Sequence, residues 1–260
     1  MGGVGAPIPQ LPSTPVTVNR ERFFFCHIQK AAGTSVRHAL DNEFGADAIY
    51  PLPEDADDPY AYSDVERLRS VFEDRGDQIE LIVGHFPFCI TDLLGVPLTT
   101  FTLLREPVAR TLSHLRYQRL VDDRYQGMSM LEAYSVPQNL FGNLHNQMVK
   151  TLGMTAEENT AGILTFLPCT ELHLERAKAA LESMAVVGVQ SDYAGFLEDL
   201  TDTFGWKVGK PVRTNTTVSE PVDQSFLDLV ARDNHLDAAL HDHAAELAAE
   251  RAAKRLARRL

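Results

Sequence analysis

Short runs of consecutive apolar residues recur along the chain, separated by segments whose apolar residues stand three or four positions apart. The runs cover Arg22–Ile28, Ile79–Gly84, Thr99–Leu104 and Ala185–Val189. Continuous apolar character, rather than alternation, predicts strands that are covered on both faces, as in a parallel sheet. Because helical patterns lie between these runs, the chain is predicted to form an α/β layered domain with a mainly parallel central sheet.

Apolar stripes with helical spacing support the predicted helices. The stripes consist of Val36, Ala39 and Leu40, of Val108, Leu112 and Leu115, and of Leu172 and Ala179. From about Asp223 onward, an Ala- and Leu-rich pattern predicts a long terminal helix with five basic side chains in its last ten residues. We expect this helix to lie on the domain, although a basic amphipathic helix is also suited to a partner or a membrane surface.

Three parts follow from this pattern: a flexible tail over residues 1–20, an α/β domain over residues 21–222 and a helical extension over residues 223–260. The tail has three Gly and four Pro and lacks the features of a secretory signal. Within the domain, Asp47–Glu80 carries eleven acidic side chains against three arginines, which predicts a solvated excursion with a short helix.

Composition and charge narrow the function classes. The chain has 260 residues, 44% of them hydrophobic and 23% charged, which is typical of a globular protein. Its net charge of −12 opposes binding to nucleic acid or anionic lipid, so any anion must be held locally. No apolar stretch is long enough to span a membrane, and three cysteines without CxxC spacing favour a reducing, cytoplasmic location without a metal site.

The segment from His27 to Ser35, HIQKAAGTS, has the features of an anion-binding turn. It follows the first predicted strand and leads into a helix that begins with Thr34 and Ser35. Small residues such as Gly33 let a phosphate approach the main chain, helix-start amides point toward it, and Lys30 supplies positive charge. The lysine precedes the glycine, unlike in the nucleotide triphosphatase loop GxxxxGK[ST], and this difference disfavours a kinase.

Two further segments place polar side chains at predicted strand ends. In LLREPVARTLSH, Arg105 ends a strand, Pro107 fits a first helical turn, and Ser113 lies about two turns along that helix. In LIVGHFPF, His85 stands just beyond a strand. Open α/β sheets bind ligands at the carboxyl ends of their strands, so these side chains are candidates for a common site.

These three segments together resemble PAPS-dependent sulfotransferases, in particular the membrane-type carbohydrate group that includes heparan 2-O-sulfotransferase. PAPS is 3′-phosphoadenosine 5′-phosphosulfate. HIQKAAGTS is similar to the family's HIPKTAGTS, LLREPVARTLSH is similar to LRDPVERFLSHY, and the GHFP segment has counterparts in the family. Gln29 replaces a proline of the motif and should loosen the turn, and Ala31 replaces a threonine. The resemblance implies a P-loop-like three-layer sandwich, the sulfotransferase fold.

The resemblance also implies a role for each matched residue. Amides of residues 32–35 (Ala32, Gly33, Thr34 and Ser35), with the two hydroxyls, should bind the 5′-phosphate, and Lys30 should neutralise the leaving group. Arg105 and Ser113 should hold the 3′-phosphate, and Arg213 lies where relatives have a loop closing over the nucleotide. His85 should be the catalytic base, and no metal is required. PAP, 3′-phosphoadenosine 5′-phosphate, would be the product.

Alternatives remain open from the sequence alone. A nucleoside-kinase-like phosphotransferase would use the same sheet and loop, and a non-catalytic PAP-binding protein would use the nucleotide site without His85. The expected acceptor is a small or carrier-bound alcohol, because a chain of net charge −12 is poorly suited to a polyanion. Trp206 fits either the core or stacking on adenine.

Overall fold

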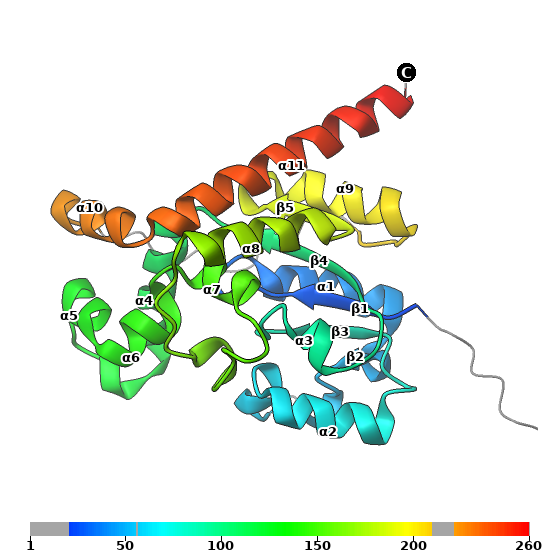
Figure 1. The fold of residues 1–260 in the computed structure, drawn as a ribbon, viewed down its shortest axis with the longest axis horizontal. Helices are drawn as coiled ribbons and strands as arrows, with labels where there is room; N and C mark the ends of the chain where they lie inside the picture. The colour runs from blue at the N-terminus through cyan, green and yellow to red at the C-terminus, as the bar shows by residue number, and fades with distance from the viewer. Residues whose placement is uncertain (1–20, 56, 210–220, 260) are drawn as a thin grey trace, which may run out of the picture.

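A computed structural model describes residues 21–55, 57–209 and 221–259 (Figure 1). Within these residues five strands form one parallel sheet in the order β2-β3-β1-β4-β5. The strands are β1 (Phe23–Cys26), β2 (Ile49–Tyr50), β3 (Leu81–Gly84), β4 (Thr99–Leu104) and β5 (Val186–Val189). The predicted parallel sheet is therefore confirmed, with β4 at its predicted bounds and the other three predicted strands shorter.

The edge strand β2 corrects the prediction for Asp47–Glu80. Ile49 and Tyr50 pair with Leu81 and Ile82 of β3 and are fully buried, so this part of the segment is not a solvated excursion. A run of only two apolar residues among acidic neighbours carries too little pattern to predict a strand.

Helices cover both faces of the sheet, as Figure 1 shows. The α-helices are α1 (Gly33–Phe44), α2 (Val65–Arg75), α3 (Ile90–Leu93), α4 (Pro107–Val121), α5 (Met130–Ser135), α6 (Pro137–Asn139), α7 (Gln147–Gly153), α8 (Glu171–Ser183), α9 (Tyr193–Phe204), α10 (Gln224–Asp233) and α11 (His235–Arg259). Short 3₁₀ turns are η1 (Ala46–Ala48), η2 (Pro53–Asp55), η3 (Pro59–Tyr62), η4 (Asp123–Tyr125), η6 (Gly162–Leu164) and η7 (Gln190–Asp192), and η5 (Leu140–Leu144) is a π-helical turn.

Alternation along the strands divides the core into two layers. Phe24 and Cys26 of β1 face a cluster that includes residues of α2, α7, α8 and α11. Phe23 and Phe25 face a second cluster with residues of α1 and α9. Side chains of neighbouring positions in a strand point to opposite faces, so β1 contributes to both clusters. The result is the three-layer α/β sandwich that the sequence predicts.

The buried face of α8 differs from the predicted stripe. Leu172 is 58% exposed and Ala179 is also exposed, whereas Leu174, Ala177 and Leu181 are buried. Both sets follow helical spacing, so periodicity alone does not decide between them. The packing of α8 against α7 and α11 selects the second set.

Trp206 belongs to the core. It packs in edge-to-face contact with Phe23, Phe44 and Phe101, with ring centroids 4.8 to 5.5 Å apart, and only 5% of it is exposed. Aromatic pairs prefer this geometry, which adds to the free energy gained by burial. Of the two roles open from the sequence, the core role is the one observed.

The C-terminal pattern forms two helices instead of one, because Asn234 ends α10. Asn234 is buried, and its side-chain oxygen accepts a hydrogen bond from the amide of Asn146, 88 residues away. Asp237 follows in α11 and accepts from the amides of Met148 and Val149 at the start of α7, while burial raises the pKa of its carboxyl to about 6. Through these contacts α11 lies against the sandwich. None of the described helices is both long enough and apolar enough to cross a membrane.

Candidate functional site

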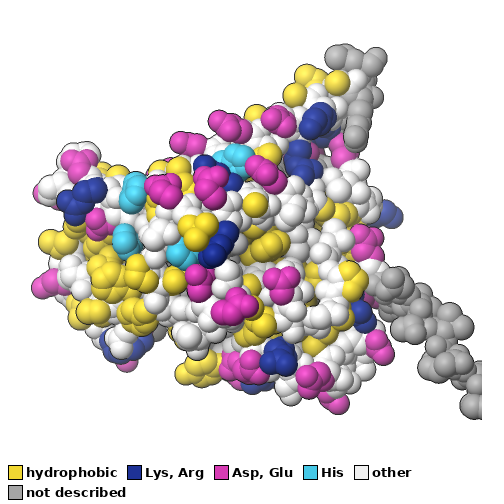
Figure 2. All heavy atoms as spheres, viewed as in Figure 1, with side chains coloured by type: hydrophobic (Ala, Val, Ile, Leu, Met, Phe, Trp, Pro, Cys, Tyr) yellow, Lys and Arg dark blue, Asp and Glu magenta, His cyan; other side chains and the backbone are white. Residues whose placement is uncertain are grey.

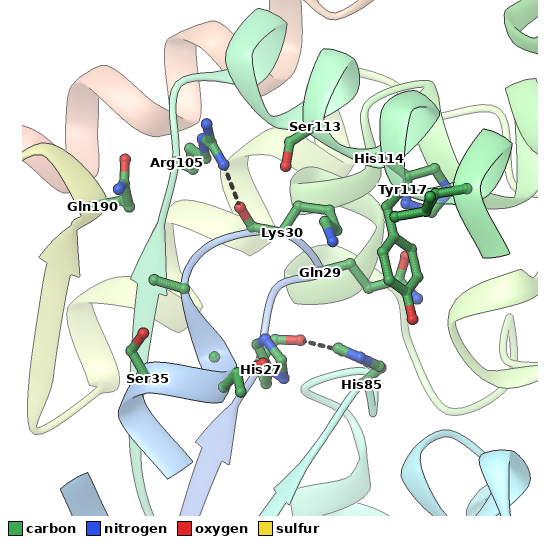
Figure 3. Close-up of a pocket in the computed structure, with 14 residues that line it drawn as sticks. His27, Gln29, Lys30, Ser35, His85, Arg105, Ser113, His114, Tyr117 and Gln190 are labelled. Atoms are coloured by element: carbon green, nitrogen blue, oxygen red, sulfur yellow. Dashed lines mark hydrogen bonds between the residues drawn. The ribbon is translucent and has the colours of Figure 1, made fainter. Parts of the chain in front are cut away.

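Four strands end at one pocket, and each is followed directly by a side chain that lines it. His27 follows β1, His85 follows β3, Arg105 follows β4 and Gln190 follows β5. Parallel strands place their carboxyl ends at one edge of the sheet, which is where α/β proteins bind ligands. The pocket has a volume of about 640 Å³, which suits a small-molecule ligand (Figure 3).

The turn between β1 and α1 has an unusual backbone. Lys30 has φ of 67° and Ala32, which precedes the first residue of α1, has φ of 63°. The left-handed region is unfavourable for residues with a Cβ and is often found where backbone amides form an anion-binding concavity. The first amides of α1, at Gly33 and Thr34, cannot bond within their own helix. The turn therefore has the geometry expected of an anion cradle.

Lys30 and Arg105 place two cations at this turn. The Lys30 ammonium lies 3.9 Å from the centroid of the Tyr117 ring, and Arg105 donates from Nη1 to the Lys30 carbonyl oxygen at 3.0 Å. Burial, together with the charge of Arg105, lowers the pKa of Lys30. The Arg105 Nε is buried and has no hydrogen-bond partner within the described part of the chain. Arg105 thus holds the turn and keeps an unused donor beside it.

Glu106 stabilises the start of α4, the helix that carries Ser113. The carboxylate of Glu106 caps α4 by accepting from the amides of Val108 and Ala109, and Pro107 occupies the first helical position as predicted. Ser113 lies on the second turn of α4 and lines the pocket on the side of Arg105 (Figure 3). The end of β4 and the capped start of α4 therefore place a guanidinium and a hydroxyl on the same side of the pocket.

His85 is held in the tautomer that a base requires. Its Nδ1 lies 2.9 Å from the carbonyl oxygen of His27, so Nδ1 carries the proton and donates it to that carbonyl (Figure 3). Nε2 of the neutral ring therefore keeps a lone pair. Burial lowers the pKa of His85, the nearby Lys30 charge lowers it further, and the hydrogen bond to His27 acts in the opposite direction. The ring is neutral at pH 7 and can accept a proton.

Gly33 makes room for an imidazole. A Cβ added at Gly33 would lie 1.7 Å from Nε2 of His27. The His27 ring stacks on Phe25 with centroids 5.5 Å apart and lies 4.3 Å from the ring of His85. The glycine in this turn is thus needed for the packing of a histidine, in addition to any approach of a ligand to the main chain.

Replacing Gly33 with alanine is expected to lower the free energy of unfolding by about 1–3 kcal/mol, because the His27 ring must leave its stacked position on Phe25. Gly142→Ala is the matched control, since an added Cβ there meets its nearest atom at 3.8 Å. Denaturant unfolding of the two variants measures the difference. The double variant His27→Ala/Gly33→Ala has no clash. Its loss in free energy of unfolding should therefore be smaller than the sum of the losses in the two single variants. Simple additivity would contradict this explanation.

The pocket is positively charged in a protein of net charge −12. Acidic side chains are spread over the face shown in Figure 2. By contrast, the described residues that line the pocket include Lys30, Arg105 and three histidines but no aspartate or glutamate. This pocket is therefore a place where the chain could hold an anion locally, as its net charge requires. Among the described residues, no group of three or more His, Cys, Asp or Glu side chains is placed to hold a metal ion.

Most residues predicted for the site line this one pocket. They are Lys30, Ala32, Gly33, Thr34, Ser35, His85, Arg105 and Ser113. Arg213 and the tail over residues 1–20 lie outside the described residues.

Sequence analysis missed several lining residues: His27, Gln29, His114, Tyr117, Leu120 and Gln190. Two of these had a usable signal. Gln190 is the first residue after a predicted strand, like His85 and Arg105, and His114 adjoins Ser113 on the same helix. His27 and Gln29 lie within the segment HIQKAAGTS but were given no role, and Tyr117 and Leu120 are recognisable only from how α4 crosses the turn after β1.

The sequence was also compared with known proteins. No protein family matches the chain, and no curated protein matches it.

Proposed function

We propose that the protein is a PAPS-dependent sulfotransferase that transfers a sulfuryl group to an alcohol. The observation that carries this proposal is the meeting of three segments in one pocket. The Lys30 turn, the Arg105–Ser113 unit and the neutral His85 come from separate parts of the chain, and each resembles a sulfotransferase segment with a role at the same substrate. A chance resemblance would not require them to converge.

The nucleotide would bind through its two phosphate ends. The 5′-phosphate would accept from the first amides of α1 and from the hydroxyls of Thr34 and Ser35, because a helix N-terminus favours an anion. The 3′-phosphate would bind Arg105 and Ser113. The buried Nε of Arg105 has no partner within the described residues, and a planar guanidinium matches a phosphate with two parallel hydrogen bonds.

Transfer would proceed by in-line displacement in one step. The acceptor oxygen forms a bond to sulfur while the bond from sulfur to the bridging phosphate oxygen breaks. The acceptor proton passes to Nε2 of His85, and PAP leaves with the electron pair of the broken bond. Lys30 would stabilise the negative charge that develops on the bridging oxygen. His85 then returns the proton to solvent.

A kinase fits the pocket less well. Kinases hold Mg²⁺ with carboxylates and phosphates, and the described lining residues include no carboxylate. Calorimetry should therefore find that PAP binds at least tenfold more tightly than ATP and that magnesium does not change the order. A preference for ATP that depends on magnesium would rule out the sulfotransferase and favour the phosphotransferase.

The acceptor side of the proposal is a small or carrier-bound neutral alcohol. A polyanionic acceptor would meet the acidic surface of this chain, which opposes its approach. A cytoplasmic location, expected from the cysteine spacing of the sequence, belongs to the same proposal.

A further inference from the structure

Gln29 and His114 are two of the polar side chains that line the pocket and take no part in the proposed chemistry. The side-chain oxygen of Gln29 is buried and has no hydrogen-bond partner within the described residues, and the ring nitrogens of His114 are buried with the Asn139 side chain as the partner of one of them at most. His114 as a whole is only 6% exposed, yet it lines the pocket. Buried polar groups in proteins are almost always paired. Because Gln29 and His114 line the pocket, a ligand bound there is in a position to supply the missing partner.

The two side chains lie together on one side of the pocket. Gln29 extends from the turn after β1 toward α4, where His114 and Tyr117 project, whereas Arg105, Ser35 and Gln190 lie on the other side (Figure 3). His114 is also close enough to Lys30 and His85 for both to affect its titration. Gln29 and His114 therefore lie on the side of the pocket away from Arg105 and Ser35, and Lys30 and His85 both act on the charge state of His114.

The chemistry of these groups defines what they can bind. Burial lowers the pKa of His114 to about 3, with the charges of Arg110 and Lys30 adding to the effect and a smaller contribution from the Asn139 side chain opposing it. The ring is therefore neutral at pH 7, with one N–H donor and one acceptor nitrogen. The free Gln29 atom is an acceptor. A matching group must be uncharged and must supply a donor hydrogen, as a hydroxyl or an amide N–H does.

We infer that Gln29 and His114 form an acceptor subsite that binds a second neutral hydrogen-bonding group next to the reacting hydroxyl. The preferred acceptor is then a diol or a hydroxy-amide, and a simple mono-alcohol is a poor substrate. This inference rests on the proposed function, in which the bound alcohol receives the sulfuryl group. The binding preference itself can be measured without sulfuryl transfer. Sites with buried polar groups reject ligands that leave those groups unpaired.

Ligand-observed NMR on the full chain tests the subsite with a matched pair of probes, 1,2-hexanediol and 1-hexanol. The two have the same carbon chain and differ by one hydroxyl. We expect the diol to bind about tenfold more tightly, which corresponds to one hydrogen bond to otherwise unpaired buried groups. Gln29→Met keeps the length of the side chain and removes its polar atoms, so the preference should fall to less than twofold.

Gln190→Met is the matched control, because it makes the same change on the opposite side of the pocket. It should leave the diol preference unchanged. His114→Phe is a second variant with the same expected loss, and thermal unfolding shows whether it folds. If it does not fold, Gln29→Met alone decides. Equal binding of the two probes by the wild-type protein, or an undiminished preference in Gln29→Met, would overturn the inference.

Titration with PAP separates this inference from the proposed function. If the wild-type protein binds PAP but binds the two probes equally, the nucleotide site is supported and the subsite is overturned. If the wild-type protein prefers the diol but does not bind PAP, the subsite is supported and the proposed function is overturned.

Discussion

Replacing His85 with asparagine is expected to reduce the rate of sulfuryl transfer by about 10²- to 10⁴-fold, the range for loss of a general base. Asparagine can still donate to the His27 carbonyl that now accepts from His85 Nδ1, but it has no basic nitrogen. Affinity for PAP should stay within about twofold, because the proposed mechanism places His85 at the acceptor and not at either phosphate. Transfer of labelled sulfate from PAPS, measured beside calorimetry with PAP, checks both expectations.

The pH dependence gives a second readout for His85. Burial and the Lys30 charge lower its pKa below the ordinary value of 6.5, so the base is already deprotonated at pH 7. The wild-type rate should be flat near neutrality and should fall only below pH 6.5, as His85 takes up a proton. This acid limb should disappear from the residual activity of His85→Asn.

His38→Asn is the matched control, because the His38 side chain is 72% exposed on α1 and lies outside the pocket. Its rate and acid limb should match those of the wild type. Undiminished transfer in His85→Asn would remove His85 from the mechanism and leave the nucleotide site intact. Loss of both transfer and PAP binding would instead indicate that His85 supports the turn through its contact with His27.

Replacing Lys30 with methionine is expected to lower kcat by about 10²- to 10³-fold, the usual effect of losing one group that stabilises developing charge. Methionine keeps an apolar chain of similar length and removes the ammonium that lies over the Tyr117 ring. PAP should bind only moderately less tightly, because the helix-start amides and Arg105 remain. The effect on kcat should therefore exceed the effect on the affinity for PAP, which single-turnover transfer and calorimetry measure separately.

Lys178→Met serves as the control for Lys30. Lys178 lies on α8, where it pairs with Glu175 and does not line the pocket. Its rate should match that of the wild type. If Lys30→Met retained kcat and lost only PAP affinity, Lys30 would be a binding residue and the leaving-group role would be wrong.

Local sequence pattern was sufficient for the elements that build the site. The strand ends at Gly84 and Leu104 follow from apolar runs, and the residues after them, His85 and Arg105, were predicted from the motifs. The first run was predicted to continue to Ile28, whereas β1 ends at Cys26. Gly33 in the first motif was also predicted as a site residue, but the reason given, close approach of a phosphate to the main chain, was incomplete. Its close contact with the His27 ring depends on the rotamer of a side chain, which the pattern does not contain.

Long-range packing decided what the pattern left open. Gln29 was noted only as a departure that loosens a turn, and its place beside His114 depends on how α4 crosses that turn. The break between α10 and α11 depends on Asn234 meeting Asn146. The choice of the buried face of α8 depends on its neighbours, because two faces had the same periodicity.

The sequence by itself determined four of the described strands, the helices that follow them and the polar residues at the strand ends, because apolar periodicity and turn chemistry are local properties. Only the tertiary structure decided that His85 donates to the His27 carbonyl, 58 positions away, and that Arg105 donates to the Lys30 carbonyl, 75 positions away. Both contacts exist because β1 lies between β3 and β4 in the sheet. That strand order results from packing over the whole domain, and it sets the tautomer of His85 and the position of the Lys30 turn.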